Sequence, residues 1–202
     1  MKRRFWRSLL PAALLSLALT GCQSALPSSP TSSPDPSGGS YSNVNPEWPL
    51  KFRAHYFGAH CFDTQHCEIL YRGFPHGADG GPSPSVASYG CPLEKLLSAG
   101  RGPIPNFPPP AKVTWRSKDG TSHEAEIDIG EIFKDQLIRH NVARADATHN
   151  ATDGMPGIIL EVNDRTINVY MRATIWTKDE QIPGNKYSHS REDLIKVFSR
   201  TY

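Results

Sequence analysis

The chain has 202 residues, with a formal net charge of +2 at neutral pH. Four of its basic residues, Lys2, Arg3, Arg4 and Arg7, lie within the first seven positions, and without the first 21 residues the formal charge becomes −2. This balance gives no sign of the basic surface with which proteins bind nucleic acids, so we expect no nucleic-acid partner.

The amino terminus has the pattern of a secretory signal. Its basic head is followed by SLLPAALLSLALTG, an apolar stretch that ends in small residues. A membrane-spanning helix needs about 20 apolar residues; this stretch is shorter, and Pro11 interrupts it. The stretch leads into Leu19-Thr20-Gly21-Cys22, which resembles the lipobox of bacterial lipoproteins.

The lipobox resemblance implies that residues 1–21 are removed and that the sulfur of Cys22 carries lipid. Several acyl chains anchor a protein stably where a single chain does not. Gln23 follows the cysteine, where an aspartate would retain a lipoprotein at the inner membrane. We therefore expect a chain anchored by lipid in the outer membrane and facing the periplasm. The alternative is an incidental cysteine after an ordinary secretory signal.

Residues 22–46 have the composition of an acylated cysteine followed by a tether. From Gln23 to Pro46, 15 of 24 residues are serine, proline or glycine. Such a segment cannot bury enough apolar surface to fold, and it would hold a folded domain away from the lipid surface.

Residues 47–202 are expected to form a single periplasmic globular domain of the α+β class, built mainly from antiparallel sheet. The alternation and residue types of strands occur over residues 50–60, 67–74, 111–117, 123–129, 157–162 and 166–176. Turn residues predict hairpins at Asp119-Gly120 and at Asn163-Asp164-Arg165.

Two helices are expected in this domain. Residues 130–141 carry apolar side chains at helical spacing and predict a central helix. Residues 190–200 predict a short C-terminal helix, in which Ser190 caps the first turn and Leu194, Val197 and Phe198 form the apolar stripe. Residues 75–110 are rich in proline and glycine, and only residues 91–100 among them look helical.

Three cysteines remain after the lipidation site: Cys61, Cys67 and Cys91. The periplasm is oxidising, so at least one disulfide is expected, and the odd number leaves one thiol over. Cys61 can pair with Cys67, or Cys91 can pair with one of them. The sequence leaves both possibilities open.

Histidines and cysteines crowd the same region, and such residues can bind metal. His55 and His60 are five positions apart on one predicted strand, however, so they point to opposite faces. We therefore expect His55, His60 and His66 to be solvated surface residues, with neither a metal nor a cofactor.

No catalytic residues emerge from the sequence. It lacks a Gly-x-Ser-x-Gly elbow, a phosphate-binding loop and a His-Glu-x-x-His motif. Glu124, Glu126 and Asp128 alternate along one strand, and an exposed polar face explains this row as well as acid–base chemistry does. We expect a protein that is not an enzyme.

The strand over residues 166–176 has two distinct faces. Tyr170, Arg172 and Trp176 share the more polar one. Exposed aromatic and arginine side chains often dominate protein–protein binding, so these three are the candidate protein-binding residues. The alternative is that the terminal helix packs over this face.

The segments FPPPAKVTWRSKDGTSHEAEIDIGEIF and LEVNDRTINVYMRATI resemble a group of uncharacterised proteobacterial lipoproteins. Members of that group lie beside type VI secretion phospholipase effectors and are regarded as their immunity proteins. The resemblance covers roughly residues 49–180. It implies a periplasmic inhibitor that binds an incoming lipase, and it supplies no binding residues.

The sequence thus predicts a membrane-anchored lipoprotein that binds a protein partner, either a toxin or an envelope protein. The alternatives are a structural or assembly lipoprotein of the envelope without catalytic activity, and a metal-dependent enzyme that joins the histidines to carboxylates.

Overall fold

The computed structural model describes residues 47–77 and 81–202, which belong to one compact unit. The predicted signal, the lipidation site at Cys22 and the tether up to residue 46 lie outside the described residues. Across the described ranges, no helix has the length and apolar character that a membrane span requires.

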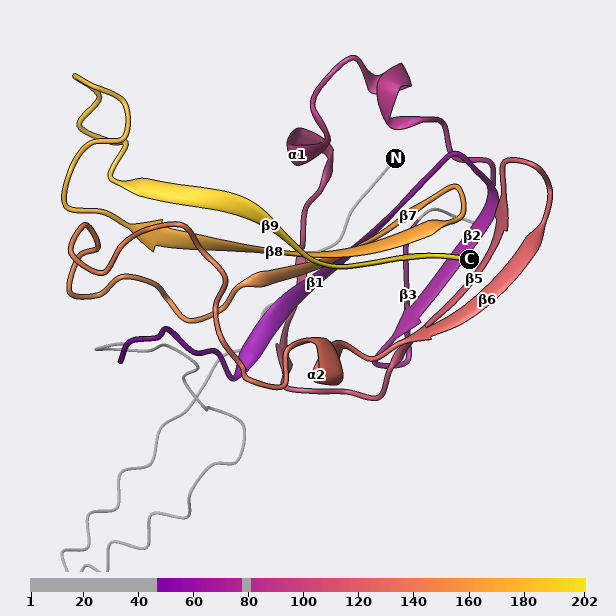
Figure 1. Ribbon diagram of the computed structural model, residues 1–202, viewed down its shortest axis with the longest axis horizontal. Coiled ribbons are helices and arrows are strands. Elements are labelled where there is room, and N and C mark those ends of the chain that lie inside the picture. Colours follow the sequence, from indigo (N-terminus) through magenta and orange to yellow (C-terminus); the bar gives the residue numbers. More distant parts are fainter. Residues whose placement is uncertain (1–46, 78–80) are drawn as a thin grey trace, which may run out of the picture. The chain divides into compact units, whose positions relative to one another are not determined.

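Nine strands form two sheets in the described part of the chain (Figure 1). The larger sheet has the order β4 (Arg101–Pro105), β1 (Ala54–Phe62), β7 (Gly157–Asn163), β8 (Thr166–Trp176) and β9 (Ser190–Thr201). The smaller sheet has the order β3 (Phe74–His76), β2 (Thr64–Tyr71), β5 (Ala111–Ser117) and β6 (Ser122–Ile127). All neighbouring strands are antiparallel except β1 and β7, which are parallel. The predicted mainly antiparallel architecture is confirmed.

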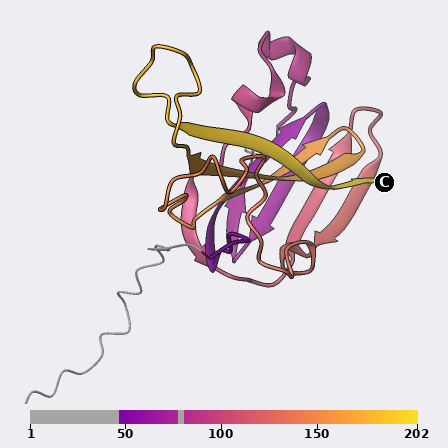
Figure 2. The same cartoon turned by 60° about the vertical axis from the view of Figure 1, so that its left-hand side comes forward.

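The core lies between the facing surfaces of the two sheets (Figure 2). Buried and exposed residues alternate along β5, as the sequence pattern predicts. The predicted apolar face of β8 points into this core through Ile167, Val169, Met171, Ala173 and Ile175. Both predicted hairpins are present, between β5 and β6 and between β7 and β8.

A disulfide between Cys61 and Cys67 joins the two sheets. The chain leaves β1 of the larger sheet and enters β2 of the smaller one through Asp63, which has a left-handed φ of 49°. This sharp turn brings the Cα atoms of the two cysteines to 6.4 Å. Cys91 is a free thiol, so the structure selects the shorter of the pairings that the sequence left open.

Residues 83–100, called the strap below, cover the outer face of the larger sheet. The strap holds the 3₁₀ turn η1 (Val86–Tyr89) and the one-turn helix α1 (Leu93–Leu96). Its buried Leu97 packs in a second apolar cluster with Phe62, Ile159 and Tyr170. The contact is close enough to require glycine in β1, because a Cβ on Gly58 would lie 1.8 Å from the carbonyl oxygen of Ser98.

The predicted central helix over residues 130–141 is wrong. The helix α2 spans only Ile129–Ile132, capped by Asp128, whose carboxylate accepts a hydrogen bond from the amide of Glu131 (2.9 Å). Gln136 then adopts a left-handed φ of 56°, which a continuing helix does not allow. Beyond it the chain is extended, and the Ile138 amide bonds to the Leu50 carbonyl (2.9 Å).

The predicted C-terminal helix is also wrong, since residues 190–201 form β9 along the whole length of β8. Leu194 packs under the strap, whereas Val197 and Phe198 pack against the core between the sheets. A bulge in the pairing with β8 puts the adjacent residues Val197 and Phe198 on the same side. Pairing with the edge of β8, which would otherwise be open, therefore outweighs the local helical spacing of these residues.

Candidate protein-binding surface

Tyr170 is buried, contrary to the exposure predicted for it, with 4% of its surface accessible. Its hydroxyl donates to Oε2 of Glu161 on β7 (2.7 Å), and its ring packs in the cluster beneath the strap. Burial, together with the Glu161 carboxylate, raises the pKa of Tyr170. A layer does cover this face of β8, as the alternative prediction held, but the strap forms it rather than a terminal helix.

Arg172 is half-buried and fastens the strap to the sheet. Its Nη1 donates to the Leu97 carbonyl (3.0 Å) and its Nη2 to the Glu94 carbonyl (2.5 Å). These carbonyls lie at the end of α1, where cationic side chains bond favourably. The guanidinium therefore binds the chain's own backbone.

Trp176 remains exposed, with 39% of its surface accessible. It is the last residue of β8 and leads into residues 177–189, which connect β8 to β9. We call Trp176 with these residues the hairpin tip. Two further large apolar side chains of the tip face solvent, Ile182 at 59% and Tyr187 at 83%.

The hairpin tip is ordered by its own hydrogen bonds. The Gln181 amide donates to the Ser188 carbonyl (2.8 Å), and the Asn185 amide donates to the Ile182 carbonyl (3.0 Å). The Ser188 hydroxyl oxygen accepts from the Ile182 amide (3.0 Å), and Asn185 Oδ1 accepts from the Tyr187 amide (3.0 Å). The exposed side chains thus project from a loop whose backbone is already fixed. Less conformational entropy is therefore lost when the loop binds a partner.

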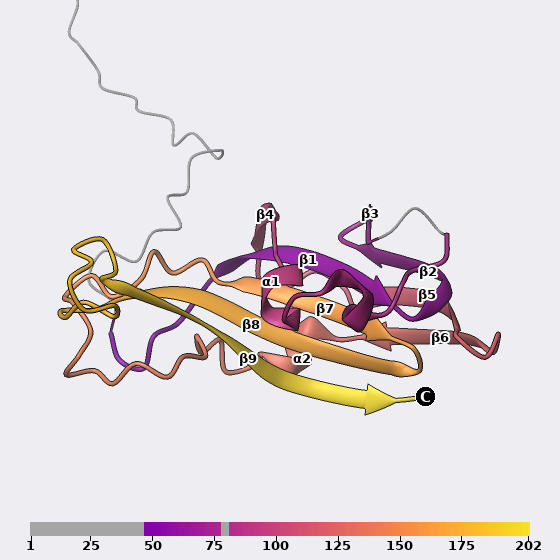
Figure 3. The same ribbon diagram turned by 90° about the horizontal axis from the view of Figure 1, so that it is seen from above.

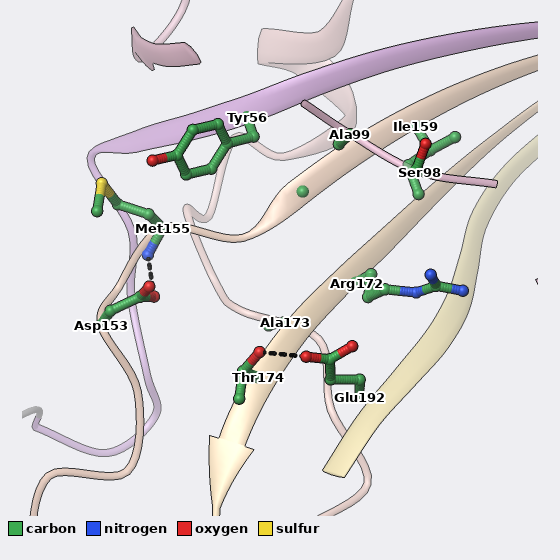
Figure 4. A pocket seen from close by; sticks show the side chains of 11 residues that line it. Tyr56, Ser98, Ala99, Asp153, Met155, Ile159, Arg172, Ala173, Thr174 and Glu192 are labelled. Atoms are coloured by element: carbon green, nitrogen blue, oxygen red, sulfur yellow. Dashed lines mark hydrogen bonds between the residues drawn. The ribbon is translucent and has the colours of Figure 1, made fainter. Parts of the chain in front are cut away.

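A recess of about 260 Å³ lies beside the hairpin tip, between the strap and the ends of β8 and β9 (Figure 4). The strap and the tip stand on the same side of the sheet (Figures 1 and 2). Thr174 lines the recess, and Trp176 lies two residues further along the same face of β8. The recess therefore lies near the base of the tip, and its described lining includes no residue of the tip itself. The other lining residues include Tyr56, Ser98, Asp153, Gly157 and Glu192.

The polar groups of the recess are mainly acceptors. Asp153 and Glu192 bring two carboxylates, and the Thr174 hydroxyl donates to Oε1 of Glu192 (2.7 Å). Arg172 is the one cation among the described lining residues; its two Nη atoms donate to backbone carbonyls, and its shielded Nε has no partner among the described residues. The recess is therefore suited to a donor group such as the side chain of a lysine or arginine.

The histidines that the sequence singled out do not come together. His55 is buried between the sheets and bonds to Asn106 and Tyr71. His60 faces the strap, where its Nε2 accepts from the Ser98 amide (3.0 Å). His66 lies on β2, 3.3 Å from the Glu68 carboxylate. The expectation of solvated histidines is wrong for His55, and the described residues contain no cluster of three or more metal ligands.

The predicted row of carboxylates divides into two roles. Glu124 and Glu126 are exposed on β6, whereas Asp128 caps α2.

A buried carboxylate, Glu161, escaped the sequence analysis. It is 1% exposed and accepts from Asn163 (3.1 Å), Asn168 (2.9 Å) and Tyr170 (2.7 Å). Its place in the apolar run of β7 gave a signal, because charged residues are almost never fully buried without a partner. The sequence could not show that the strap covers the outer face of this strand.

Comparison of the chain with models of protein families, with curated proteins and with solved structures finds no match in any of the three.

Proposed function

We propose that this chain is a membrane-anchored periplasmic protein that binds a protein partner through the hairpin tip and the recess beside it. One observation supports this proposal above the others: an ordered loop holds Ile182 and Tyr187 in solvent, at 59% and 83% exposure. Neither side chain contributes to the core clusters of the domain. Their burial against a partner would be favourable, at roughly 25 cal/mol for each Å² of apolar surface.

The surface has the composition of a small binding centre. Trp176 and Tyr187 are aromatic residues of the kind that dominate binding free energy at protein interfaces. The adjacent recess offers Asp153 and Glu192 to a basic side chain of the partner. A partner with an apolar patch next to a lysine or arginine would fit both parts.

We propose further that the partner is an incoming phospholipase delivered by type VI secretion, and that the chain is its immunity protein. The resemblance to immunity-associated lipoproteins and the lipobox at Cys22 support this finer proposal. An immunity protein must wait at the membrane that the toxin attacks and must reach the toxin. A lipid anchor, a tether and an exposed binding loop would meet these needs.

The proposal is tested by competition between sibling cells. A strain without this gene is mixed with siblings that deliver the effector, and its survival is counted after complementation with the full-length chain or its variants. The wild-type chain should restore survival. Survival with the double variant Ile182→Ser, Tyr187→Ser should be at least tenfold lower than with the wild-type chain. Leu70→Ser, a similarly exposed apolar site on β2 at 43%, is the control and should protect fully.

Two results would contradict the proposal. If the deletion strain survives as well as wild type, the immunity role fails. If the double variant is exported at the wild-type level and protects fully, the hairpin tip is not the binding surface.

The membrane anchor has its own test. In Cys22→Ser the thiol that would carry the lipid is absent, so the chain should move from the envelope fraction to the soluble periplasmic fraction. Tight sedimentation of this variant with envelopes would rule out lipidation at Cys22.

A further inference from the structure

A second cavity lies far along the fold from the hairpin tip, at the edge strands of the two sheets. β3 is an edge of the smaller sheet and β4 is an edge of the larger one, and both lie on the same side of the domain (Figure 3). The cavity between them has a volume of about 200 Å³. We call it the β3–β4 pocket. Its lining includes Tyr71, Arg72, Phe74, His76, Arg101 and Ile104.

The charged residues that the structure describes in the lining of the β3–β4 pocket are both basic. Arg72 and Arg101 line it, and its described lining contains no aspartate or glutamate. Neither arginine takes part in an ion pair with another described residue. Arg101 instead lies over the ring of Phe74, with its Cζ 5.6 Å from the ring centroid. Two exposed guanidinium groups beside a cavity favour an anionic occupant.

The pocket also contains a polar atom without a partner. The Nε2 of His76 is shielded from solvent and makes no hydrogen bond to any described residue. A shielded polar atom that lacks a partner costs free energy. Burial and the neighbouring Arg101 lower the pKa of His76. A carboxylate beside the imidazole would oppose both effects by favouring its protonated form, whose Nε2 would then donate to the carboxylate.

Part of the pocket wall is apolar, and the core supports it from behind. Phe74 is half exposed at the mouth, and Ile104 is buried at the base. The Tyr71 hydroxyl behind them lies 3.2 Å from His55 Nε2, and Asn106 fixes the other side of that imidazole at 2.9 Å. The base of the pocket is therefore held in place from within the core.

We propose that the β3–β4 pocket binds a small organic carboxylate, with Arg101 and Arg72 holding the carboxylate and Phe74 contacting the apolar body. Ligand pockets for drug-sized molecules measure about 300–1,000 Å³. A cavity of about 200 Å³ instead takes a molecule of the size of benzoate. This site is separate from the surface proposed for the protein partner, and either proposal can fail without the other.

The test is a titration of the full-length chain with benzoate, followed by amide shifts in NMR spectra. Benzoate should shift the amides of Phe74, His76 and Arg101. Benzamide, which has nearly the same shape without the charge, should bind at least tenfold more weakly. Inorganic phosphate should also bind at least tenfold more weakly, because it lacks the apolar body.

Variants locate the site. Arg101→Gln should weaken benzoate binding about tenfold, the order expected for the loss of a hydrogen bond to a charged group. Arg144 is an exposed arginine in the loop before β7, and Arg144→Gln is the control. This variant should bind benzoate as tightly as the wild-type chain does. Phe74→Leu provides a second test, with a predicted loss of at least threefold.

Three results would overturn the proposal: equal affinity for benzamide and benzoate, equal affinity for phosphate and benzoate, or unchanged benzoate binding in Arg101→Gln. The spectrum of each variant also shows whether it is folded, since the dispersion of its amide signals should match wild type. Because Arg101 is exposed, its substitution removes no core contact.

Discussion

His55 is fully buried between the two sheets and is held by hydrogen bonds on both ring nitrogens. The amide nitrogen of Asn106 donates to the Phe52 carbonyl (3.0 Å), so its Oδ1 is left to accept from His55 Nδ1. The other ring nitrogen then accepts from the Tyr71 hydroxyl. This arrangement fits a neutral imidazole, and burial lowers the pKa of His55 to about 4, against the opposing effect of Asn106.

His55 should make the fold sensitive to acid. The unfolded chain binds this proton near pH 6.5, but the folded chain binds it only near pH 4. The stability that the neutral His55 provides is therefore fully present above pH 6.5 and is lost as the pH falls from about 6.5 to about 4. The loss should be about 3 kcal/mol. Urea unfolding at several pH values should show a steeper dependence in wild type than in His55→Gln.

Direct titration gives the control for this prediction. The ring protons of His55, assigned from the variant, should titrate near pH 4 in NMR spectra of the folded chain. A titration near pH 6.5 would contradict the neutral, buried imidazole.

At the scale of elements, the strap depends on glycine in the strand beneath it. Gly58→Ala places a methyl group where the Ser98 carbonyl oxygen now lies, so the strap must move away from β1. The free energy of unfolding should fall by about 2 kcal/mol, as in other overpacked sites. The Leu97 amide, which bonds to the Leu93 carbonyl (3.1 Å), should also exchange faster with solvent.

The strap itself offers the matched control. Gly100→Ala adds the same methyl group at a position where, beyond the two neighbouring residues in the chain, no heavy atom lies within 4 Å of the new Cβ. It should leave both the unfolding free energy and the Leu97 exchange rate close to wild type. Equal effects of the two substitutions would show that close packing on Gly58 does not hold the strap.

The disulfide connects the two sheets at one point. Because it closes a short loop, replacing both Cys61 and Cys67 with alanine should lower the free energy of unfolding by about 2 kcal/mol. Cys91→Ala should have little effect, since Cys91 is free and only partly buried. Peptide mapping that finds Cys91 in a disulfide with either of the others would contradict this pairing.

The strands and hairpins could be predicted from sequence because their signals are local. Alternation along residues 111–117 and the Asp119-Gly120 turn depend on neighbours in the chain. Residues 190–201 form β9 because they pair with β8. Nothing within residues 190–200 signals that pairing, and their own spacing favours a helix. Residues 130–141 likewise do not form the helix that their spacing predicts. The Ile138 amide bonds instead to the carbonyl of Leu50, about 90 positions earlier in the chain.

The candidate surface was predictable only in part, for the same reason. The two faces of β8 were evident from alternation, and Trp176 is exposed as predicted. Tyr170 and Arg172 lie on the same face but under the strap. The strap residue that Arg172 contacts, Leu97, lies 75 places earlier in the chain. Exposure of a strand face cannot be read from that strand when a distant loop covers it.

At the scale of the whole molecule, the fold separates its exposed features. The hairpin tip extends from the ends of β8 and β9, whereas the β3–β4 pocket is lined in part by β4. In the larger sheet β4 is the edge strand opposite β9 (Figure 3). The core between the sheets supports the base of the pocket through Tyr71 and Ile104, and the tip is ordered by its own hydrogen bonds. One chain could therefore bind a protein and a small carboxylate without competition between them.

Photo-crosslinking in living cells tests the central claim, that the hairpin tip contacts a protein partner. A photoreactive phenylalanine analogue replaces Tyr187 in the full-length chain, and the same analogue at exposed Glu124 on β6 serves as the control. Illumination during attack by effector-delivering siblings should join the Tyr187 position to the effector and leave the Glu124 position unjoined. An effector adduct at Glu124 with none at Tyr187, or no effector adduct at either position, would contradict the account.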